Sequence, residues 1–203
     1  MHPFWYSASP ETQRKLISLF ILSLASKSPI TTLSPSPTSA LSTFDTELEY
    51  TRSPHDIAAV LRWALRHLRL EGESFGRPDG QWKWYQTFAE AERSSSYPLN
   101  AFSESLVPQL PPSHLQLLIA TLDIVSSLAA YSEHNGISGS KLSKFFGLWL
   151  LTTKRSEQGD DWASFYSRWE RAGRILEHLF LAHIRYDSVL GLRLCMLDAF
   201  LQR

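Results

Sequence analysis

The sequence predicts an all-α fold for this chain of 203 residues. Several segments repeat apolar residues at intervals of three and four, the period of a helix with one buried face. No segment alternates apolar and polar residues at every second position, as a half-buried strand would. Apolar residues make up 43% of the chain, enough for one core, and the length is too short for two comfortable domains. We therefore expect a single helical domain over residues 1–203.

The first predicted helix begins at Ser9-Pro10-Glu11, with proline in the first turn and an acid facing the helix dipole. Its apolar stripe includes Leu16 and Leu24, and it should end near Ser26. The run from Leu16 to Ala25 also imitates a secretory signal. Glu11 before the run and the usable helical stripe favour a buried core helix.

A Ser/Pro-rich loop is predicted at about residues 27–44, because this composition cannot bury a face. The next helix should begin at Ser53-Pro54 and run to about Leu70. Arg62, Arg66 and Arg69 lie three and four residues apart on its polar side and form a basic ridge. Such a ridge is usually a solvated face.

The second half of the chain carries further helical patterns, separated by turn residues. The turn at His134-Asn135-Gly136 divides two of them, and Ser138 or Ser140 should cap the second. The helices are predicted over residues 82–91, 97–108, 110–134 and about 139–151, then from residue 160 or 161, with a separate helix over 187–201.

Charge and motif content exclude several functional classes. Lys plus Arg and Asp plus Glu number 20 each, so no global field favours nucleic acid or an anionic membrane. The single Cys195 permits no internal disulfide, and the seven histidines show no ligand spacing, so we expect neither a metal site nor a cofactor. The apolar run from Leu16 to Ala25 is too short for a bilayer, so we expect no integral membrane segment.

The segment from Leu110 to Leu151 has three parts in a fixed order. Leu110-Pro111 opens a helix, Asn135-Gly136-Ile137 forms a turn, and Phe146-Gly147-Leu148-Trp149-Leu150-Leu151 closes the next helix. This order resembles the central segment of RhoGAP domains, which carry Leu-Pro, Asn-x-Met and Phe-Gly-Pro-x-Leu-Leu there; Leu148 replaces the family's proline. The resemblance implies a RhoGAP-like helical domain. It gives Asn135 the place of an asparagine that supports the family's finger loop and the GTPase switch regions.

The helix that contains the basic ridge extends the resemblance. Leu61-Arg62-Trp63-Ala64-Leu65-Arg66-His67-Leu68-Arg69 is similar to the family's Leu-Lys-x-Tyr-Leu-Arg-Glu-Leu-Pro, although the Glu-Leu-Pro end is lost. Arg62 then takes the place of a GTPase-contacting lysine, and Arg66 that of an arginine. On the residues alone, both arginines also fit a solvated face, and Asn135 also fits a plain turn residue.

RhoGAP domains insert an arginine beside the transferring phosphate of a Rho-type GTPase, and this residue contributes about 10³–10⁵ in rate. The family's motif is Gly-x-Phe-Arg, and Phe4 fits its phenylalanine. Trp5 then occupies the arginine position. An indole is uncharged and has one donor N–H, against five on a guanidinium. The resemblance therefore implies no catalytic residue and no enzyme activity.

This combination is similar to the degenerate RhoGAP-like domain of a fungal morphogenesis family, which includes a suppressor of budding defects and a meiotically up-regulated relative. The run from Trp169 to Arg185 resembles the end of that domain. The resemblance implies a cytoplasmic protein at sites of polarised growth, acting in cell-wall signalling. Its implied partners are a Rho-family small GTPase and a polarity or bud-emergence scaffold protein. Met1 leaves no room for the helical segment that precedes the finger loop in RhoGAP domains, so we expect this chain to lack it, as a fragment or a shortened form.

Two alternatives stay open at this point. The chain would be an active GTPase activator if a displaced arginine, Arg14 or Arg52, reached the phosphate. It would be a plain helical scaffold if it used the fold only as a platform and never contacted a GTPase.

Overall fold

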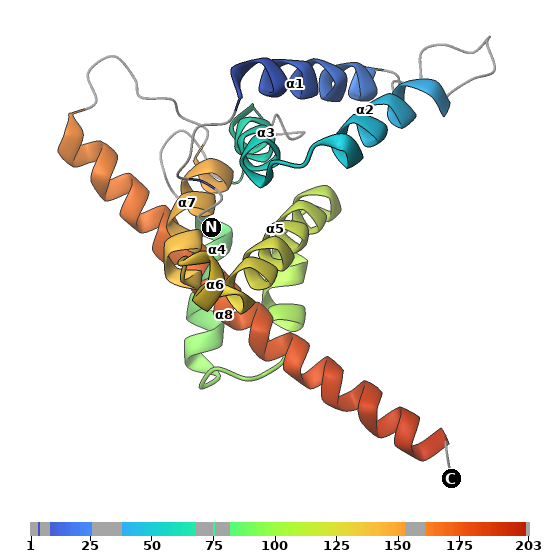
Figure 1. Ribbon diagram of the computed structural model, residues 1–203. Helices are drawn as coiled ribbons and strands as arrows, with labels where there is room; N and C mark the ends of the chain where they lie inside the picture. The colour runs from blue at the N-terminus through green and yellow to red at the C-terminus, as the bar shows by residue number, and fades with distance from the viewer. Residues whose placement is uncertain are drawn as a thin grey trace. The chain divides into compact units, whose positions relative to one another are not determined.

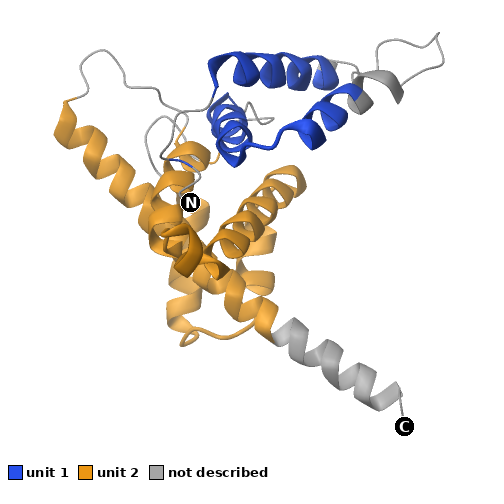
Figure 2. Ribbon diagram, viewed as in Figure 1, with its two compact units in different colours: residues 1–67 blue, residues 68–203 orange. Residues whose placement is uncertain are grey.

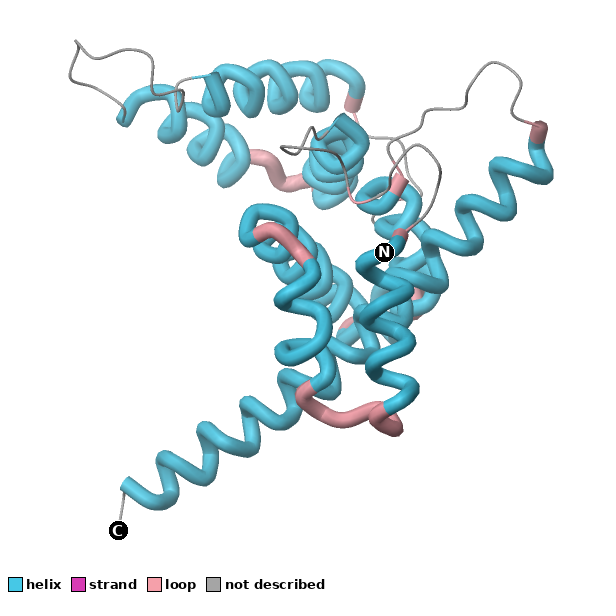
Figure 3. Tube along the Cα trace, turned by 180° about the vertical axis from the view of Figure 1, so that it is seen from behind, coloured by secondary structure: helices cyan, strands magenta, loops and turns pink. Residues whose placement is uncertain are grey.

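The computed structural model describes residues 9–25, 38–67, 82–152 and 161–201, together with Phe4 and Phe75. Within these ranges the secondary structure is entirely helical, as the tube in Figure 3 shows, and the all-α prediction is confirmed. The chain divides into two compact units, residues 1–67 and 68–203 (Figures 1 and 2). Each unit is described by itself, so the expectation of one domain over residues 1–203 stays a prediction.

The first unit consists of α1 (Pro10–Ala25), α2 (Thr38–Tyr50) and α3 (Pro54–His67), with α1 packed on both of the others. Leu16 is fully buried at the centre of α1, as its place in the apolar stripe predicts, whereas Leu24 of the same predicted stripe is exposed. The backbone N–H of Ser9 donates to Oδ1 of Asp56 over 2.7 Å, which joins the start of α1 to the first turn of α3. Both helices begin at the Ser-Pro pairs expected from the sequence.

The helix α2 is a correction to the sequence analysis. It begins at Thr38, inside the segment expected to be a loop up to about residue 44. Serine and threonine weakly disfavour helix, but packing on α1 overrides this preference. The rings of Phe20 and Phe44 lie 5.5 Å apart, and Nζ of Lys15 lies 2.7 Å from a carboxylate oxygen of Glu47.

The second unit begins with α4 (Lys83–Ser94), followed by a π-helical turn η1 (Phe102–Leu106), a 3₁₀ turn η2 (Val107–Gln109) and α5 (Pro112–Ala130). The indole N–H of Trp82 donates to the backbone oxygen of Leu151 over 3.1 Å, so a buried tryptophan satisfies the C-terminal end of α7 (Gly139–Leu151). Ser138 caps the N-terminus of α7, because its side chain accepts a hydrogen bond from the N–H of Lys141. It is one of the two serines that the sequence offered as caps for this helix.

The closest helix packing in this unit is between α7 and α8 (Trp162–Leu201). Gly147 makes this approach possible, because a Cβ at that position would lie 2.5 Å from the backbone oxygen of Ala172. On the other helix, a Cβ at Gly173 would lie 3.0 Å from Cα of Lys144. The indole N–H of Trp169 also donates to the backbone oxygen of Lys144 over 3.0 Å. A glycine on each helix therefore lets the two backbones come together.

The helix α8 is continuous over 40 residues, where the sequence analysis expected a boundary at Asp187. An aspartate before an apolar run is typical of a helix start. Here Asp187 lies inside the helix, one turn after His183, and its Oδ2 atom lies 3.1 Å from Nδ1 of that histidine. The i,i+4 contact gives the carboxylate a partner within the helix, so it does not act as a cap.

In length and apolar composition, α5 would be able to cross a membrane, although core helices of soluble proteins often share these properties. Leu118, Leu122 and Val125 are fully buried, and α5 packs against α7 and α8. These contacts are typical of a helix that helps to form a protein core.

Candidate functional site

The two arginines expected to contact a GTPase lie on the exposed face of α3. Arg62 and Arg66 are both exposed, and neither has a hydrogen bond or an ion pair within the residues that the structure describes. On the same helix, Val60 and Leu65 are buried, so α3 is fixed by apolar packing while its two guanidinium groups face solvent. An arginine pair with this placement has all its donors available to an acidic partner.

The other arginines considered in the sequence analysis are also exposed. Arg14 lies in the second turn of α1, and Arg52 lies just before α3. Trp5, the residue at the expected finger position, lies outside the described residues.

Asn135 has a structural role in the turn between α5 and α7. Its Nδ2 donates to the backbone oxygen of Leu128 over 2.7 Å, and its Oδ1 accepts from the N–H of Ile137 over 2.8 Å. Gly136 follows with φ 73°, a left-handed conformation that glycine adopts without strain. The short helix α6 (Ser132–Asn135) ends there, and the fully buried Ile137 anchors the chain before α7. The amide therefore positions the turn by contacts to both sides of it.

The expected binding surface is distributed over both units. Arg62 and Arg66 belong to the first unit and share one helix face, whereas Asn135 belongs to the second unit and contacts Leu128 and Ile137. The expectation that these residues form one surface with Trp5 stays a prediction.

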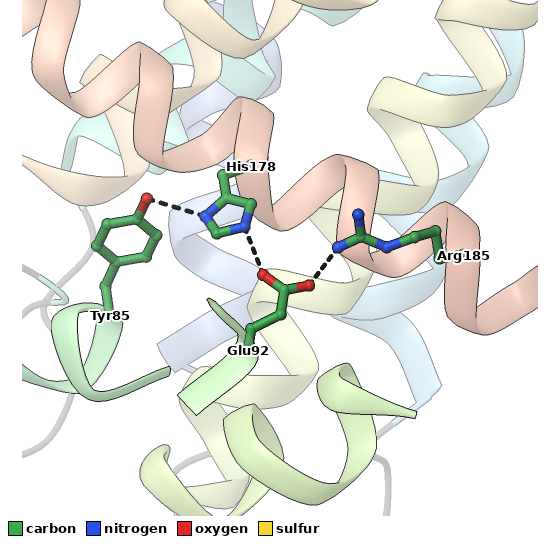
Figure 4. A network of polar contacts seen from close by, with 4 residues as sticks. All are labelled: Tyr85, Glu92, His178 and Arg185. Carbon is green, nitrogen blue, oxygen red and sulfur yellow. Dashed lines mark hydrogen bonds and ion pairs between the residues drawn. The ribbon is translucent and has the colours of Figure 1, made fainter. Parts of the chain in front are cut away.

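A buried polar network that the sequence analysis did not identify joins α4 to α8 (Figure 4). Glu92, in the last turn of α4, is fully buried. Its carboxylate accepts from Arg185 at one oxygen and lies 2.5 Å from Nε2 of His178 at the other. The Tyr85 hydroxyl lies 3.0 Å from Nδ1 of the same imidazole. The carboxylate, imidazole and phenol thus form a continuous chain of contacts.

The donors and acceptors of this network can be assigned from its chemistry. A carboxylate only accepts, so Nε2 of His178 carries a proton toward Glu92. In the neutral imidazole, Nδ1 then accepts from the Tyr85 hydroxyl. Arg185 supplies the positive charge, and its guanidinium also lies 5.9 Å from the centre of the Tyr97 ring. The buried negative charge is therefore paired with one cation and one N–H donor.

The network joins two helices and includes a phenol whose pKa is raised. Burial, followed by the charge of Glu92, raises the pKa of Tyr85 above its ordinary value of 10.0. An activated nucleophile needs the opposite shift. His178 and Arg185 lie seven residues apart on one face of α8, so the Glu92 carboxylate fixes how α4 lies along that helix.

Two properties of this network kept it from being predicted from the sequence. The contact between Glu92 and His178 spans 86 residues, so no local pattern indicates it. The available signal was the run from Trp169 to Arg185, which contains both α8 members of the network and was recognised only as a family resemblance. A charged residue in an apolar helix stripe is a hint of a buried partner.

Comparison with known protein families identifies a family model that matches most of the chain. The model of the family described as "Meiotically up-regulated protein Msb1/Mug8 domain" matches residues 40–189. This range includes α3, the Asn135 turn and every member of the Glu92 network. Searches of the curated proteins and of the solved structures found no match.

Proposed function

Since the chain belongs to the Msb1/Mug8 family, and so has a role in fungal morphogenesis and meiosis, we propose that it is a non-catalytic, RhoGAP-like interaction module. In this role it binds a Rho-family GTPase or a polarity scaffold protein, in the cytoplasm or at cortical sites of polarised growth. The observation that supports the proposal is the free arginine pair on α3. Arg62 and Arg66 are exposed and unpaired among the described residues.

The charge of this pair determines the kind of partner that it suits. Two guanidinium groups four residues apart on a helix can each form bidentate bonds with a carboxylate. Rim charges of this type mainly raise the association rate and the salt sensitivity of binding. An acidic surface of a GTPase or of a scaffold protein fits this requirement.

The proposed absence of catalysis rests on Trp5. In the RhoGAP-like alignment this residue holds the position of the arginine finger, and an indole cannot neutralise the charge that develops on the transferring phosphate. The module would then bind the GTPase without accelerating hydrolysis.

A binding experiment tests the proposal. The full chain is immobilised and offered GTP-loaded and GDP-loaded Rho-family GTPases, and separately a candidate bud-emergence scaffold protein. Replacing both Arg62 and Arg66 by alanine should reduce capture, and wild-type capture should weaken as the salt concentration rises. In the matched control, Arg93 and Arg174, two exposed arginines of the second unit, are both replaced by alanine. This control removes as much positive charge as the test variant does. Equal capture by both double variants, or no capture by the wild type, would contradict the proposal.

A kinetic experiment separates binding from catalysis. Single-turnover GTP hydrolysis should be unchanged by the wild-type chain. The Trp5→Arg variant should accelerate hydrolysis if Trp5 holds the finger position, with a finger contributing up to about 10³–10⁵. Acceleration by the wild type that disappears in Arg14→Ala or Arg52→Ala would instead establish the displaced-arginine alternative.

A further inference from the structure

A second cluster of polar groups joins α5 to α8 and shares no residue with the Glu92 network. Asp123 comes from α5, and His183 and Asp187 come from α8, where they are four residues apart. Nε2 of His183 lies 3.7 Å from Oδ1 of Asp123, and Nδ1 lies 3.1 Å from Oδ2 of Asp187. One ligand atom from each residue lies within 4.8 Å of the other two.

The imidazole in this cluster is buried but has no aligned hydrogen bond. The side chain of His183 is 5% exposed, and its Nδ1 atom has no hydrogen-bond partner despite the nearby carboxylate of Asp187. The contact to Asp123 is too long for a hydrogen bond. The imidazole thus lies between two carboxylates without an aligned hydrogen bond to either, and a shared cation would give its buried nitrogen a ligand bond instead.

The surroundings hold the ring in place. Phe102, in the π-helical turn η1, is 2% exposed and meets the imidazole edge to face, with ring centres 5.1 Å apart. Asp123 and Asp187 have side chains that are 60% and 54% exposed. The cluster therefore has an apolar wall behind the histidine and an open side toward solvent, through which an ion can enter.

We propose that Asp123, His183 and Asp187 form a binding site for a divalent transition-metal ion of the zinc class. One imidazole nitrogen and two carboxylate oxygens are a ligand set that zinc accepts, at distances of about 2.0–2.2 Å. Ligand atoms around a tetrahedral zinc are about 3.3 Å apart at these bond lengths, so atoms that now lie within 4.8 Å need only small side-chain rotations. Water completes the coordination on the open side. Magnesium and calcium prefer sites made of oxygen alone, so the histidine selects against them.

The site joins two helices and therefore links metal binding to stability. Asp123 lies on α5 and the other two ligands lie on α8, so a bound ion clamps one helix to the other. An ion that binds only the folded state raises the unfolding temperature in a concentration-dependent way. This provides a readout that needs no knowledge of the biological activity.

The test uses the full, tag-free chain and Zn²⁺ as the probe, with Co²⁺ as a spectroscopic substitute and Mg²⁺ as a comparison. We expect one Zn²⁺ per chain by equilibrium dialysis with metal quantification, and a rise in unfolding temperature with Zn²⁺. Asp123→Asn and Asp187→Asn, both at exposed positions, should each weaken Zn²⁺ binding at least about 10-fold without unfolding the chain. His183→Gln should remove binding, but its buried position makes the two aspartate variants the decisive ones.

Two control variants remove a ligand type outside the cluster. Glu177→Gln removes a carboxylate from α8, and His134→Ala removes an exposed histidine of the same unit. Both should bind Zn²⁺ as the wild type does. The proposal would be overturned if the wild type did not take up one Zn²⁺ per chain, or if Asp123→Asn and Asp187→Asn bound Zn²⁺ as tightly as the wild type. It would also be overturned if Mg²⁺ stabilised the wild type as much as Zn²⁺ does.

Discussion

Replacing Gly147 by alanine tests the close approach of α7 and α8, because two effects of opposite sign compete. In an isolated helix, alanine is more stable than glycine by about 1 kcal/mol. In this packing, the added Cβ would lie 2.5 Å from the oxygen and 2.8 Å from the carbonyl carbon of Ala172. These are backbone atoms and cannot rotate away, so overpacking should cost about 2–3 kcal/mol. We expect a net loss of about 1–2 kcal/mol.

The assay is urea and thermal unfolding followed by tryptophan fluorescence. Five of the seven tryptophans lie in the second unit, so this signal reports mainly on the helices concerned: Trp82, Trp84, Trp149, Trp162 and Trp169. For a chain of this size, a loss of about 1–2 kcal/mol corresponds to a fall in Tm of about 2–8 °C. Gly139→Ala is the matched control, because its Cβ would meet the edge of the Phe180 ring, a side chain that can shift. An increase in stability for Gly147→Ala would refute the close backbone contact.

Substitutions at four further positions test the turn and the buried network. Asn135→Ala should lower the free energy of unfolding by about 1–3 kcal/mol in urea unfolding, because two backbone groups lose their partner. Asn135→Asp keeps the oxygen that accepts from Ile137, so its free energy of unfolding should fall by less. Arg185→Ala should cost about 3 kcal/mol, at the low end for a broken buried pair because 33% of the side chain is exposed. Adding Glu92→Gln should recover part of that loss, and strictly additive losses would contradict the pairing. Because the pKa of Tyr85 is raised in the folded state, its contribution to stability is present below pH 10.0 and is lost as the pH rises through the folded pKa. In thermal unfolding measured at increasing alkaline pH, the stability of Tyr85→Phe should fall less steeply than that of the wild type. An unchanged slope would contradict the raised pKa of Tyr85.

Local signals predicted the helix starts well. The Ser-Pro pairs mark the first residues of α1 and α3, and the Ser138 side chain caps α7, so these starts depend on a few adjacent residues. The turn at Gly136 was also predictable, because few other residues adopt its left-handed conformation without strain. Features that depend on neighbouring residues alone could therefore be predicted from the sequence.

Features that depend on distant partners could not be predicted. The composition of residues 27–44 indicates a loop, but the end of this segment, from Thr38, belongs to α2, which packs on α1. Asp187 looks like a cap until its contact with His183 is known. The two partners of the Glu92 carboxylate, His178 and Arg185, lie 86 and 93 residues further along the chain. For the candidate binding surface, the sequence identified the exposed arginines of α3, while the role of Asn135 in closing its turn required the structure.

The length of α8 has a consequence for the kinds of change that the chain can tolerate. One helix carries Gly173 at the crossing with α7, His178 and Arg185 in the buried network, and His183 beside Asp123. Successive residues of a helix are rotated by about 100°. Inserting or deleting one residue after Gly173 would turn all later side chains by that angle and remove their contacts together. A point substitution in α8 removes the contacts of one residue, whereas a change in length alters all of these contacts together, so we expect length variation in this family to fall outside this stretch.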